Sequence, residues 1–315
     1  MKIAILDTET FAKEKELDVF LPLGEVKMYK NTTKEETYQR VKNADIIVTN
    51  KVGLSNSLLD SLDHLRLVCI TATGTNNIDI DYANSKGIEV RNVAGYASES
   101  VAQHTFSMLF HLISDIGYYD EYVKSKKYSQ QRAFNYFEGG FWEIKDKTFG
   151  IIGLGAIGKR VAELAEAFGC QVIYYSTSGK NTQNKWSHCS LKELLSTSDI
   201  ISINAPLNEA TYNLINKETL AWCKKTAILL NTGRGGIVNE IELANTLNND
   251  DLLAAGLDVF EKEPLEASNP LLHLNDPKRI VLTPHNAWTG RNARKVLIQK
   301  TIKSIEEFTT KKGLG

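Results

Sequence analysis

The sequence has few cysteines and no long apolar run. Its four cysteines lie far apart among 315 residues and form no Cys-x-x-Cys pair. This spacing argues against a disulfide framework and favours reduced thiols in a cytoplasmic protein. The six histidines are equally scattered, so the sequence predicts no metal site. No apolar run reaches 18 residues and the first apolar stretch is too short for a signal peptide, so we expect neither a membrane span nor secretion.

The chain also has no excess of charge of one sign. Lys and Arg number 37 and Asp and Glu number 38, which gives a formal net charge of −1. Without a strong overall field, the sequence predicts neither a nucleic acid nor a membrane surface as partner, and a small molecule is expected instead. A length of 315 residues exceeds one ordinary α/β core and predicts two domains.

A glycine-rich turn stands near the middle of the chain. The run Gly153-Leu-Gly155-Ala-Ile-Gly158 follows the apolar segment 148–152 and precedes an amphipathic helix. In this context the pattern predicts a dinucleotide site, where the glycines permit a tight turn, close approach of the pyrophosphate and close helix packing. The first helical N–H groups, from Ala156 and Ile157 onward, would then face phosphate.

No Asp or Glu occurs between Gly169 and Leu191. A dinucleotide site usually has an acid about 20 residues after the glycines, where it binds the ribose 2′-hydroxyl of NAD. Here the next apolar segment, 171–175, leads instead to Ser176, Thr177 and Lys180. Loss of the carboxylate removes repulsion against the 2′-phosphate of NADP, but no Arg is present for a bidentate clamp. The choice between NAD and NADP therefore stays open.

Apolar segments of strand length alternate with helical patterns, which favours parallel sheets built from βαβ units. Expected strands are 2–6, 44–49, 65–71 and 88–92 in the first half, and 148–152, 171–175, 199–204, 226–231, 254–259 and 280–283 in the second. The six later strands fit a doubly wound Rossmann sheet. Long helices at 98–113 and about 292–308 would carry the chain between two domains, and 128–141 is expected as an ordered loop. The predicted domains are 1–99 with 288–315, and 100–287.

Three segments with reactive side chains follow the later strands. Arg234 stands in a glycine-rich turn after 226–231, Glu263 stands beyond 254–259, and His285 follows the last strand. All three lie at carboxyl ends of parallel strands, where open α/β sheets bind ligands. Each residue alone has an ordinary structural explanation, whereas their placement beside a dinucleotide site favours a catalytic one.

These segments together resemble the D-isomer-specific 2-hydroxyacid dehydrogenase family. The segments that carry the resemblance are 73–79, 100–104, 149–158, 205–211, 231–239, 255–264 and 283–288. The resemblance implies an α/β protein with two Rossmann-like domains, a dinucleotide-binding domain and a smaller flavodoxin-like substrate domain, with the active site in the cleft between them. It also implies Arg234, Glu263 and His285 as the catalytic residues of an NAD- or NADP-dependent oxidoreductase.

The implied roles agree with the chemistry of the three side chains. Histidine titrates near neutrality, so His285 can give or take the hydroxyl proton, and Glu263 would orient the ring and favour its protonated form. Arg234 is permanently charged and suits a substrate carboxylate and a polarised carbonyl oxygen. Hydride would pass between the nicotinamide and C2 of a small D-2-hydroxy acid or 2-keto acid, such as glycerate, hydroxypyruvate or glyoxylate.

The resemblance extends to further contacts. Predicted cofactor-binding residues are Gly153, Gly155, Ala156, Ile157, Gly158, Ser176, Thr177, Lys180, Ala205, Pro206, Thr211, Thr232, Asp258 and Thr105. Predicted substrate-binding residues are Asn50, Lys51, Thr73, Gly74, Arg234 and Trp288. The long crossover helix and the segment 118–122 suggest a homodimer contact.

Two other functions use the same fold. One is a formate dehydrogenase, although the members we compare have Gln beside the catalytic His where Glu263 stands here. The other is a dinucleotide-sensing corepressor without catalysis, in which the acid, the Arg and the His would be dispensable. Their joint presence argues against the corepressor.

Overall fold

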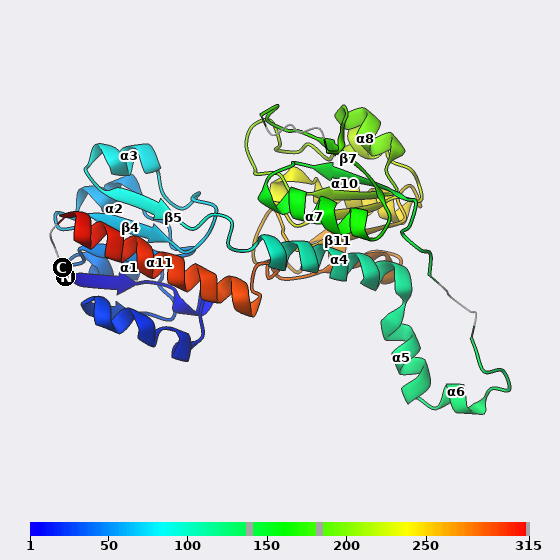
Figure 1. Cartoon of the computed structure of the whole chain (residues 1–315), viewed down its shortest axis with the longest axis horizontal. Helices are drawn as coiled ribbons and strands as arrows, with labels where there is room; N and C mark the ends of the chain where they lie inside the picture. Colours follow the sequence, from blue (N-terminus) through cyan, green and yellow to red (C-terminus); the bar gives the residue numbers. More distant parts are fainter. Residues whose placement is uncertain (137–140, 181–184, 313–315) are drawn as a thin grey trace. The chain divides into compact units, whose positions relative to one another are not determined.

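The computed structural model describes residues 1–136, 141–180 and 185–312, and the chain divides into two compact units. The first unit comprises Met1–Ala97 with Thr289–Gly315, and the second comprises Ser98–Trp288. Each unit is a parallel sheet with helices (Figure 1), as the alternating pattern of the sequence predicts.

The first unit holds a five-stranded parallel sheet of order β2-β1-β3-β4-β5. The strands are β1 (Lys2–Ile5), β2 (Glu25–Met28), β3 (Ile46–Thr49), β4 (Leu67–Ile70) and β5 (Glu89–Asn92). Its α-helices are α1 (Lys34–Val41), α2 (Asn56–Asp60), α3 (Ile80–Ser85) and α11 (Arg291–Lys312), and α11 packs against β4. Every residue of β3 and β4 is buried, as expected for central strands covered on both faces. The strand order is that of flavodoxin-like folds.

The second unit holds a seven-stranded parallel sheet of order β12-β11-β10-β9-β6-β7-β8. The strands are β6 (Thr148–Ile152), β7 (Gln171–Tyr175), β8 (Ser187–His188), β9 (Ile200–Ile203), β10 (Ile228–Asn231), β11 (Ala254–Leu257) and β12 (Ile280–Leu282). Its α-helices are α4 (Ser98–Ser114), α5 (Ile116–Lys124), α6 (Lys127–Gln130), α7 (Ala156–Ala167), α8 (Leu191–Thr197), α9 (Lys217–Leu220) and α10 (Glu240–Asn248). β6 is the first strand of this sheet in the sequence, and the later strands are added on both sides of it. This is the doubly wound Rossmann order. The predicted fold is thus confirmed.

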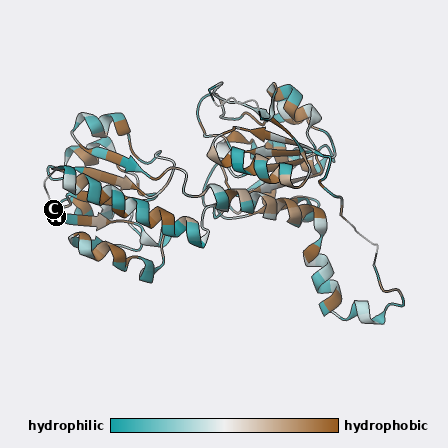
Figure 2. Ribbon diagram, viewed as in Figure 1, coloured by the Kyte–Doolittle hydropathy of each residue, from teal (hydrophilic) through white to brown (hydrophobic). Residues whose placement is uncertain are grey.

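Two hydrophobic clusters fill opposite faces of this second sheet. Neighbouring residues of one strand contribute to different clusters: Leu229 belongs to one, and Ile228 and Leu230 belong to the other. This alternation follows from the two-residue period of a strand. Figure 2 shows the strands of both units as predominantly apolar and the outer faces of several helices as polar.

The structure corrects the predicted elements in three places. The strands β2 and β8 are absent from the sequence prediction, because β2 is a half-exposed edge strand and β8 has only two exposed residues. Five predicted strands are shorter by two or more residues: 44–49, 65–71, 199–204, 226–231 and 254–259 are observed as Ile46–Thr49, Leu67–Ile70, Ile200–Ile203, Ile228–Asn231 and Ala254–Leu257. The segment 128–141, expected as a loop, begins within α6, and its residues 137–140 lie outside the described residues.

Candidate active site

The glycine turn after β6 has the geometry that a dinucleotide phosphate needs. Gly153 has a φ of 90°, and a Cβ there would lie 2.9 Å from backbone atoms of Ala205. A Cβ on Gly158 would lie 2.1 Å from the carbonyl oxygen of Gly153. Over Gly155, in contrast, nothing lies within 4 Å of a built Cβ, so the backbone there is open to a ligand. The geometry at Gly153 and Gly158 fits a tight turn and close helix packing, and a pyrophosphate contact at Gly155 stays a prediction.

The first turn of α7 offers hydrogen-bond donors at this opening. Gly155 is the N-cap residue, and no side chain in the described part of the chain caps the helix. The first N–H groups of a helix have no intrahelical partner and favour an anion. Ala156 is exposed and Ile157 is half-buried at this end. These features fit a dinucleotide pyrophosphate.

The end of β7 presents hydroxyl groups and a lysine. Ser176 is buried, and its Oγ has no hydrogen-bond partner in the described structure. Thr177 is half-buried and Lys180 is exposed, with the Lys180 N–H donating to Ser178 Oγ at 3.3 Å. No carboxylate stands within 176–180 to repel a 2′-phosphate.

Several predicted cofactor contacts are bonded within the protein itself. Thr211 is fully buried, and its hydroxyl donates to the carbonyl of Pro206 at 2.7 Å. The hydroxyl of Thr105, also fully buried, donates to the carbonyl of Val101 at 2.9 Å and lies 3.3 Å from that of Thr232. The hydroxyl groups of Thr105 and Thr211 are therefore engaged by other protein groups, and a direct cofactor contact stays a prediction for them.

The loop after β12 pairs the predicted histidine with the predicted acid. His285 Nδ1 lies 2.7 Å from Glu263 Oε2, and the other carboxylate oxygen of Glu263 accepts the Phe260 N–H at 3.1 Å. Because an ionised carboxylate only accepts, Nδ1 carries a proton and Nε2 is the nitrogen left for exchange with a ligand. The two side chains are 22% and 32% exposed, so a ligand can reach them. His285 has a φ of 51°, which kinks the backbone at this residue.

Asp258, at the end of β11, holds that loop in place. Its side chain is 1% exposed, and Oδ1 accepts the Thr283 hydroxyl at 2.6 Å and the Asn286 N–H at 3.0 Å. Oδ2 accepts the Ala287 N–H at 2.9 Å, and the backbone carbonyl of Asp258 accepts the His285 N–H at 2.7 Å. Asp258 is thus engaged by the loop, and its predicted contact with the cofactor carboxamide stays a prediction.

Arg234 lies in the turn after β10, and the turn packs closely on the segment that leads to Glu263. A Cβ on Gly235 would lie 1.8 Å from the carbonyl carbon of Phe260, so only glycine fits there. The half-buried Arg234 donates from Nη1 to the carbonyl of Gly233 at 2.8 Å, while its own carbonyl accepts from Asn231 Nδ2 at 2.9 Å. The turns that carry Arg234 and Glu263 are therefore neighbours. Trp288, half-buried, ends the second unit.

The other predicted substrate residues belong to the first unit. The backbone N–H groups of Asn50 and Lys51 donate to the carboxylate of Asp7 at 2.9 and 2.6 Å. Asp7 is 3% exposed and stands two residues after the end of β1, so a buried charge fixes the turn after β3. Asp7 is absent from the residues predicted from the sequence, although an acid at the end of an apolar strand is a detectable signal. The carbonyl of Thr73, next to Gly74, accepts from Asn92 Nδ2 at 2.7 Å.

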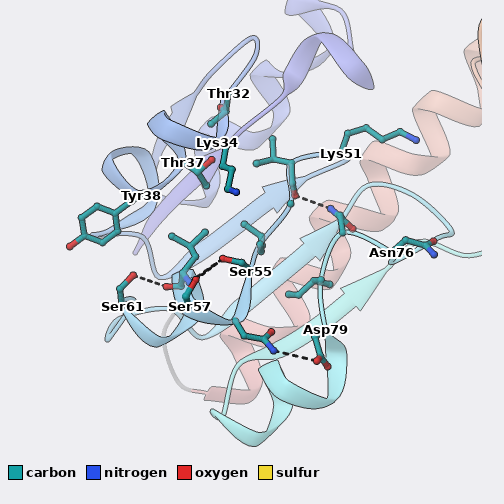
Figure 3. Close-up of a pocket in the computed structure, with 17 residues that line it drawn as sticks. Thr32, Lys34, Thr37, Tyr38, Lys51, Ser55, Ser57, Ser61, Asn76 and Asp79 are labelled. Carbon is teal, nitrogen blue, oxygen red and sulfur yellow. Dashed lines mark hydrogen bonds between the residues drawn. The ribbon is translucent and has the colours of Figure 1, made fainter. Parts of the chain in front are cut away.

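Lys51 also lines an open groove of about 1050 Å³ in the first unit. Figure 3 shows Lys51 at one end of this groove and Tyr38 at the other, with hydroxyl and amide side chains between them. Asn50, Thr73 and Gly74 are not among its lining residues.

The described residues form neither a metal site nor a helical membrane span. Among residues 1–136, 141–180 and 185–312, no group of three or more His, Cys, Asp or Glu is arranged to hold a metal ion. In the same ranges, none of the helices has both the length and the apolar character of a bilayer span.

Comparison with known proteins gives one consistent family. Residues 106–287 match the family model described as D-isomer specific 2-hydroxyacid dehydrogenase, NAD binding domain. A protein of Haemophilus influenzae, provisionally named a 2-hydroxyacid dehydrogenase, is 38% identical over 98% of both chains. The hydroxypyruvate reductase of Blautia hydrogenotrophica is 34% identical over 91% of this chain and 89% of its own.

A solved structure shows the same architecture. The acyclic imino acid reductase Bsp5, in complex with NADPH and D-Arg, superposes with a TM-score of 0.87 at 28% identity, covering 99% of this chain and 98% of the other. The similarity therefore spans both units of the chain.

Proposed function

Because the chain belongs to the D-isomer-specific 2-hydroxyacid dehydrogenase family, and is thus an NAD- or NADP-dependent oxidoreductase, we propose that it reduces a small 2-keto acid with Arg234, Glu263 and His285. The observation that carries the residue assignment is the 2.7 Å contact between His285 Nδ1 and Glu263 Oε2. The two residues follow strands of the same sheet as β6, which leads into the glycine turn.

Each side chain has a task that its chemistry suits. NADH or NADPH, when bound, supplies the hydride. His285 gives a proton from Nε2 to the keto oxygen, and in the reverse direction Nε2 takes the hydroxyl proton. Glu263 orients the ring through Nδ1 and stabilises its protonated form. Arg234 binds the substrate carboxylate and polarises the carbonyl through its planar guanidinium.

The dinucleotide would be held by the glycine turn and the first turn of α7. The open space over Gly155 would admit the pyrophosphate, and the N–H groups of Ala156, Ile157 and Gly158 in the first turn of α7 would bind it. Lys51, Thr73, Gly74 and Trp288 are proposed to contribute to substrate binding. We expect the protein to act in the cytoplasm, where buried free thiols such as Cys69 and Cys170 stay reduced.

A panel of keto acids tests the proposal. Purified protein is assayed by absorbance loss with NADH and, separately, NADPH against hydroxypyruvate, glyoxylate and pyruvate, and with formate and either oxidised cofactor. Turnover of a keto acid that His285→Ala abolishes supports the proposal. Turnover of formate alone favours the formate dehydrogenase. Tight cofactor binding with no turnover of any compound favours the corepressor.

We further propose that α5 and α6 form a contact between two copies of the chain. These helices extend away from the sheet of the second unit, and neither has a buried residue. Ile116 is 68% exposed, Val123 53% and Phe134 87%. The Tyr122 ring stacks on that of Tyr136 at 4.3 Å, so the segment keeps a defined fold. Short helices that bury nothing are marginal in water. A two-fold dimer, the commonest symmetric oligomer, would cover them.

The dimer is tested by solution mass. We expect twice the chain mass in light scattering, and expect Ile116→Asp with Val123→Asp to yield monomers. A matched control introduces Asp at Val19 and Leu21, which are 50% and 55% exposed in the first unit. A monomeric wild type, or a dimer that survives the α5 changes, would exclude this contact.

A further inference from the structure

A stripe of α4 faces the loop that carries His285. Ser100, His104 and Met108 follow one another at four-residue intervals, which places them on one side of the helix. Ser100 Oγ donates to the Ala287 carbonyl at 2.6 Å, and His104 Nε2 lies 3.0 Å from Thr283 Oγ1. The same hydroxyl lies 3.8 Å from Met108 Sδ. All three side chains therefore contact the segment between Thr283 and Ala287.

The hydrogen bonds fix where the proton of His104 resides. The Thr283 hydroxyl has one proton, and its 2.6 Å contact with the buried Asp258 carboxylate uses it. A hydroxyl that donates to a carboxylate can still accept, but cannot donate again. His104 Nε2 must therefore carry a proton and donate it to Thr283 Oγ1. The imidazole also lies 3.6 Å from Asp258 Oδ1, so the three groups form one polar cluster.

This cluster supports the backbone on which His285 stands. The backbone carbonyl of Asp258 accepts the His285 N–H, and its carboxylate accepts the N–H groups of Asn286 and Ala287. Oδ1 of the same carboxylate accepts the Thr283 hydroxyl. The backbone at His285 is in the left-handed region, which residues other than glycine adopt only when their surroundings impose it. A change in the orientation of Thr283 or Asp258 would therefore move the imidazole of His285.

We propose that His104 is a positioning residue, which donates from Nε2 to Thr283 and thereby holds Asp258 and the His285 loop in the reactive arrangement. Its catalytic consequence rests on the proposed function of His285. The side chain is 24% exposed, so packing alone gives no reason for an imidazole at this place. A network of buried polar groups is sensitive to loss of one member, because the remaining groups are left unpaired.

Two substitutions of His104 distinguish the effect of its hydrogen bond from that of its side-chain volume. His104→Gln retains an N–H donor close to the place of Nε2, whereas His104→Leu retains the volume without a donor. We expect His104→Leu to lower kcat about ten- to thirtyfold, with a Kd for NADH or NADPH within about twofold of wild type. We expect His104→Gln to recover kcat to within about threefold. The matched control is His111→Leu, an exposed histidine further along α4, with kcat unchanged.

The outcomes decide between the two roles. Full kcat in His104→Leu, or equal losses in the Leu and Gln variants, would overturn the proposal. A fall in kcat with a matching fall in Tm in both variants would assign His104 to folding alone and would also overturn it.

A second measurement needs no turnover, so it separates this inference from the proposed function. In protein labelled with 15N-histidine, His104 is expected to show a proton on Nε2 that exchanges slowly with solvent. Thr283→Val should make that exchange faster by about tenfold or more. A His104 ring with its proton on Nδ1 only would overturn the inference, even in a protein that reduces keto acids. A protected Nε2 proton in a protein without turnover would uphold the hydrogen bond while the proposed function fails.

Discussion

His285 Nδ1 and Glu263 Oε2 lie 2.7 Å apart, although the residues follow different strands of the sheet. The contact occupies one ring nitrogen and leaves the other for exchange with a ligand. It also joins the loop after β12 to the loop after β11, so His285 is held at two points, by Glu263 at the ring and by Asp258 at the backbone.

Removal of either partner should lower the rate of proton transfer. We expect His285→Ala to lower kcat by about 10²- to 10⁴-fold, because general acid–base catalysis by a positioned side chain contributes about that much. Glu263→Gln keeps an acceptor oxygen and loses the charge, so a smaller loss, at least about tenfold, is expected. Steady-state kinetics measure both, and the Kd for NADH, followed by fluorescence, should stay unchanged. A near-normal rate in His285→Ala would remove this residue from the mechanism.

Arg234 should act on both binding and rate. We expect Arg234→Ala to raise KM for the keto acid and to lower kcat, since the guanidinium is proposed to bind the carboxylate and to polarise the carbonyl. Arg234→Lys keeps the charge but loses the planar fork, so it should recover only part of kcat/KM. Initial rates over a range of substrate concentrations separate the two effects. An Arg234→Ala variant with wild-type kcat and raised KM would limit the residue to ground-state binding.

A methyl group added to the glycine turn should have different effects at two positions: it should lower stability at Gly158 and cofactor affinity at Gly155. In Gly158→Ala the new Cβ would lie 2.1 Å from the Gly153 carbonyl oxygen, so a loss of about 1–3 kcal/mol in the free energy of unfolding is expected. In Gly155→Ala nothing lies within 4 Å, and a φ of −76° suits alanine, so the fold should tolerate it. Cofactor affinity should instead fall, because the methyl group occupies the space of the pyrophosphate. Urea unfolding and cofactor titration of both variants check this, and equal stability losses would contradict it.

The sequence predicts most of the fold because the central strands carry a strong local signal. All residues of β3, β4, β9, β10 and β11 are buried, and near-continuous apolar runs of that length indicate central parallel strands. The edge strands β2 and β8 lack such runs, so their pairing depends on neighbours far along the chain.

The site is predictable to a smaller extent. Arg234, Glu263 and His285 follow strands, so topology alone places them at one edge of the sheet. The partners of Asp258 and Thr105 are decided by packing across the fold, and no local pattern encodes them. For the same reason His104 and Asp7, whose contacts span 179 and 43 residues, escape the sequence analysis.

The cysteines should resist alkylation in the folded protein. Burial raises the pKa of the Cys69 thiol to about 12 and that of Cys170 to about 11. Because the pKa is raised on folding, the stability linked to the neutral thiol is complete below the ordinary value of about 9 and is lost as pH rises toward 12. At pH 8 we expect iodoacetamide to modify Cys69 only after unfolding in urea, as mass spectrometry of peptides will show. Rapid modification of Cys69 in the native protein at pH 8 would contradict its burial.

The end of β7 should decide the cofactor. Ser176→Asp restores a carboxylate where a 2′-phosphate would bind, so the ratio of kcat/KM for NADPH to that for NADH should fall at least about tenfold. Lys180→Ala should lower kcat/KM for NADPH alone, by about three- to tenfold at low salt and less at high salt, because Lys180 is exposed and its field is screened. Ser178→Ala on the same turn serves as a control without change of charge. If Lys180→Ala leaves the kinetics with both cofactors untouched, the lysine does not contact the phosphate, and any use of NADPH must depend on the hydroxyl groups.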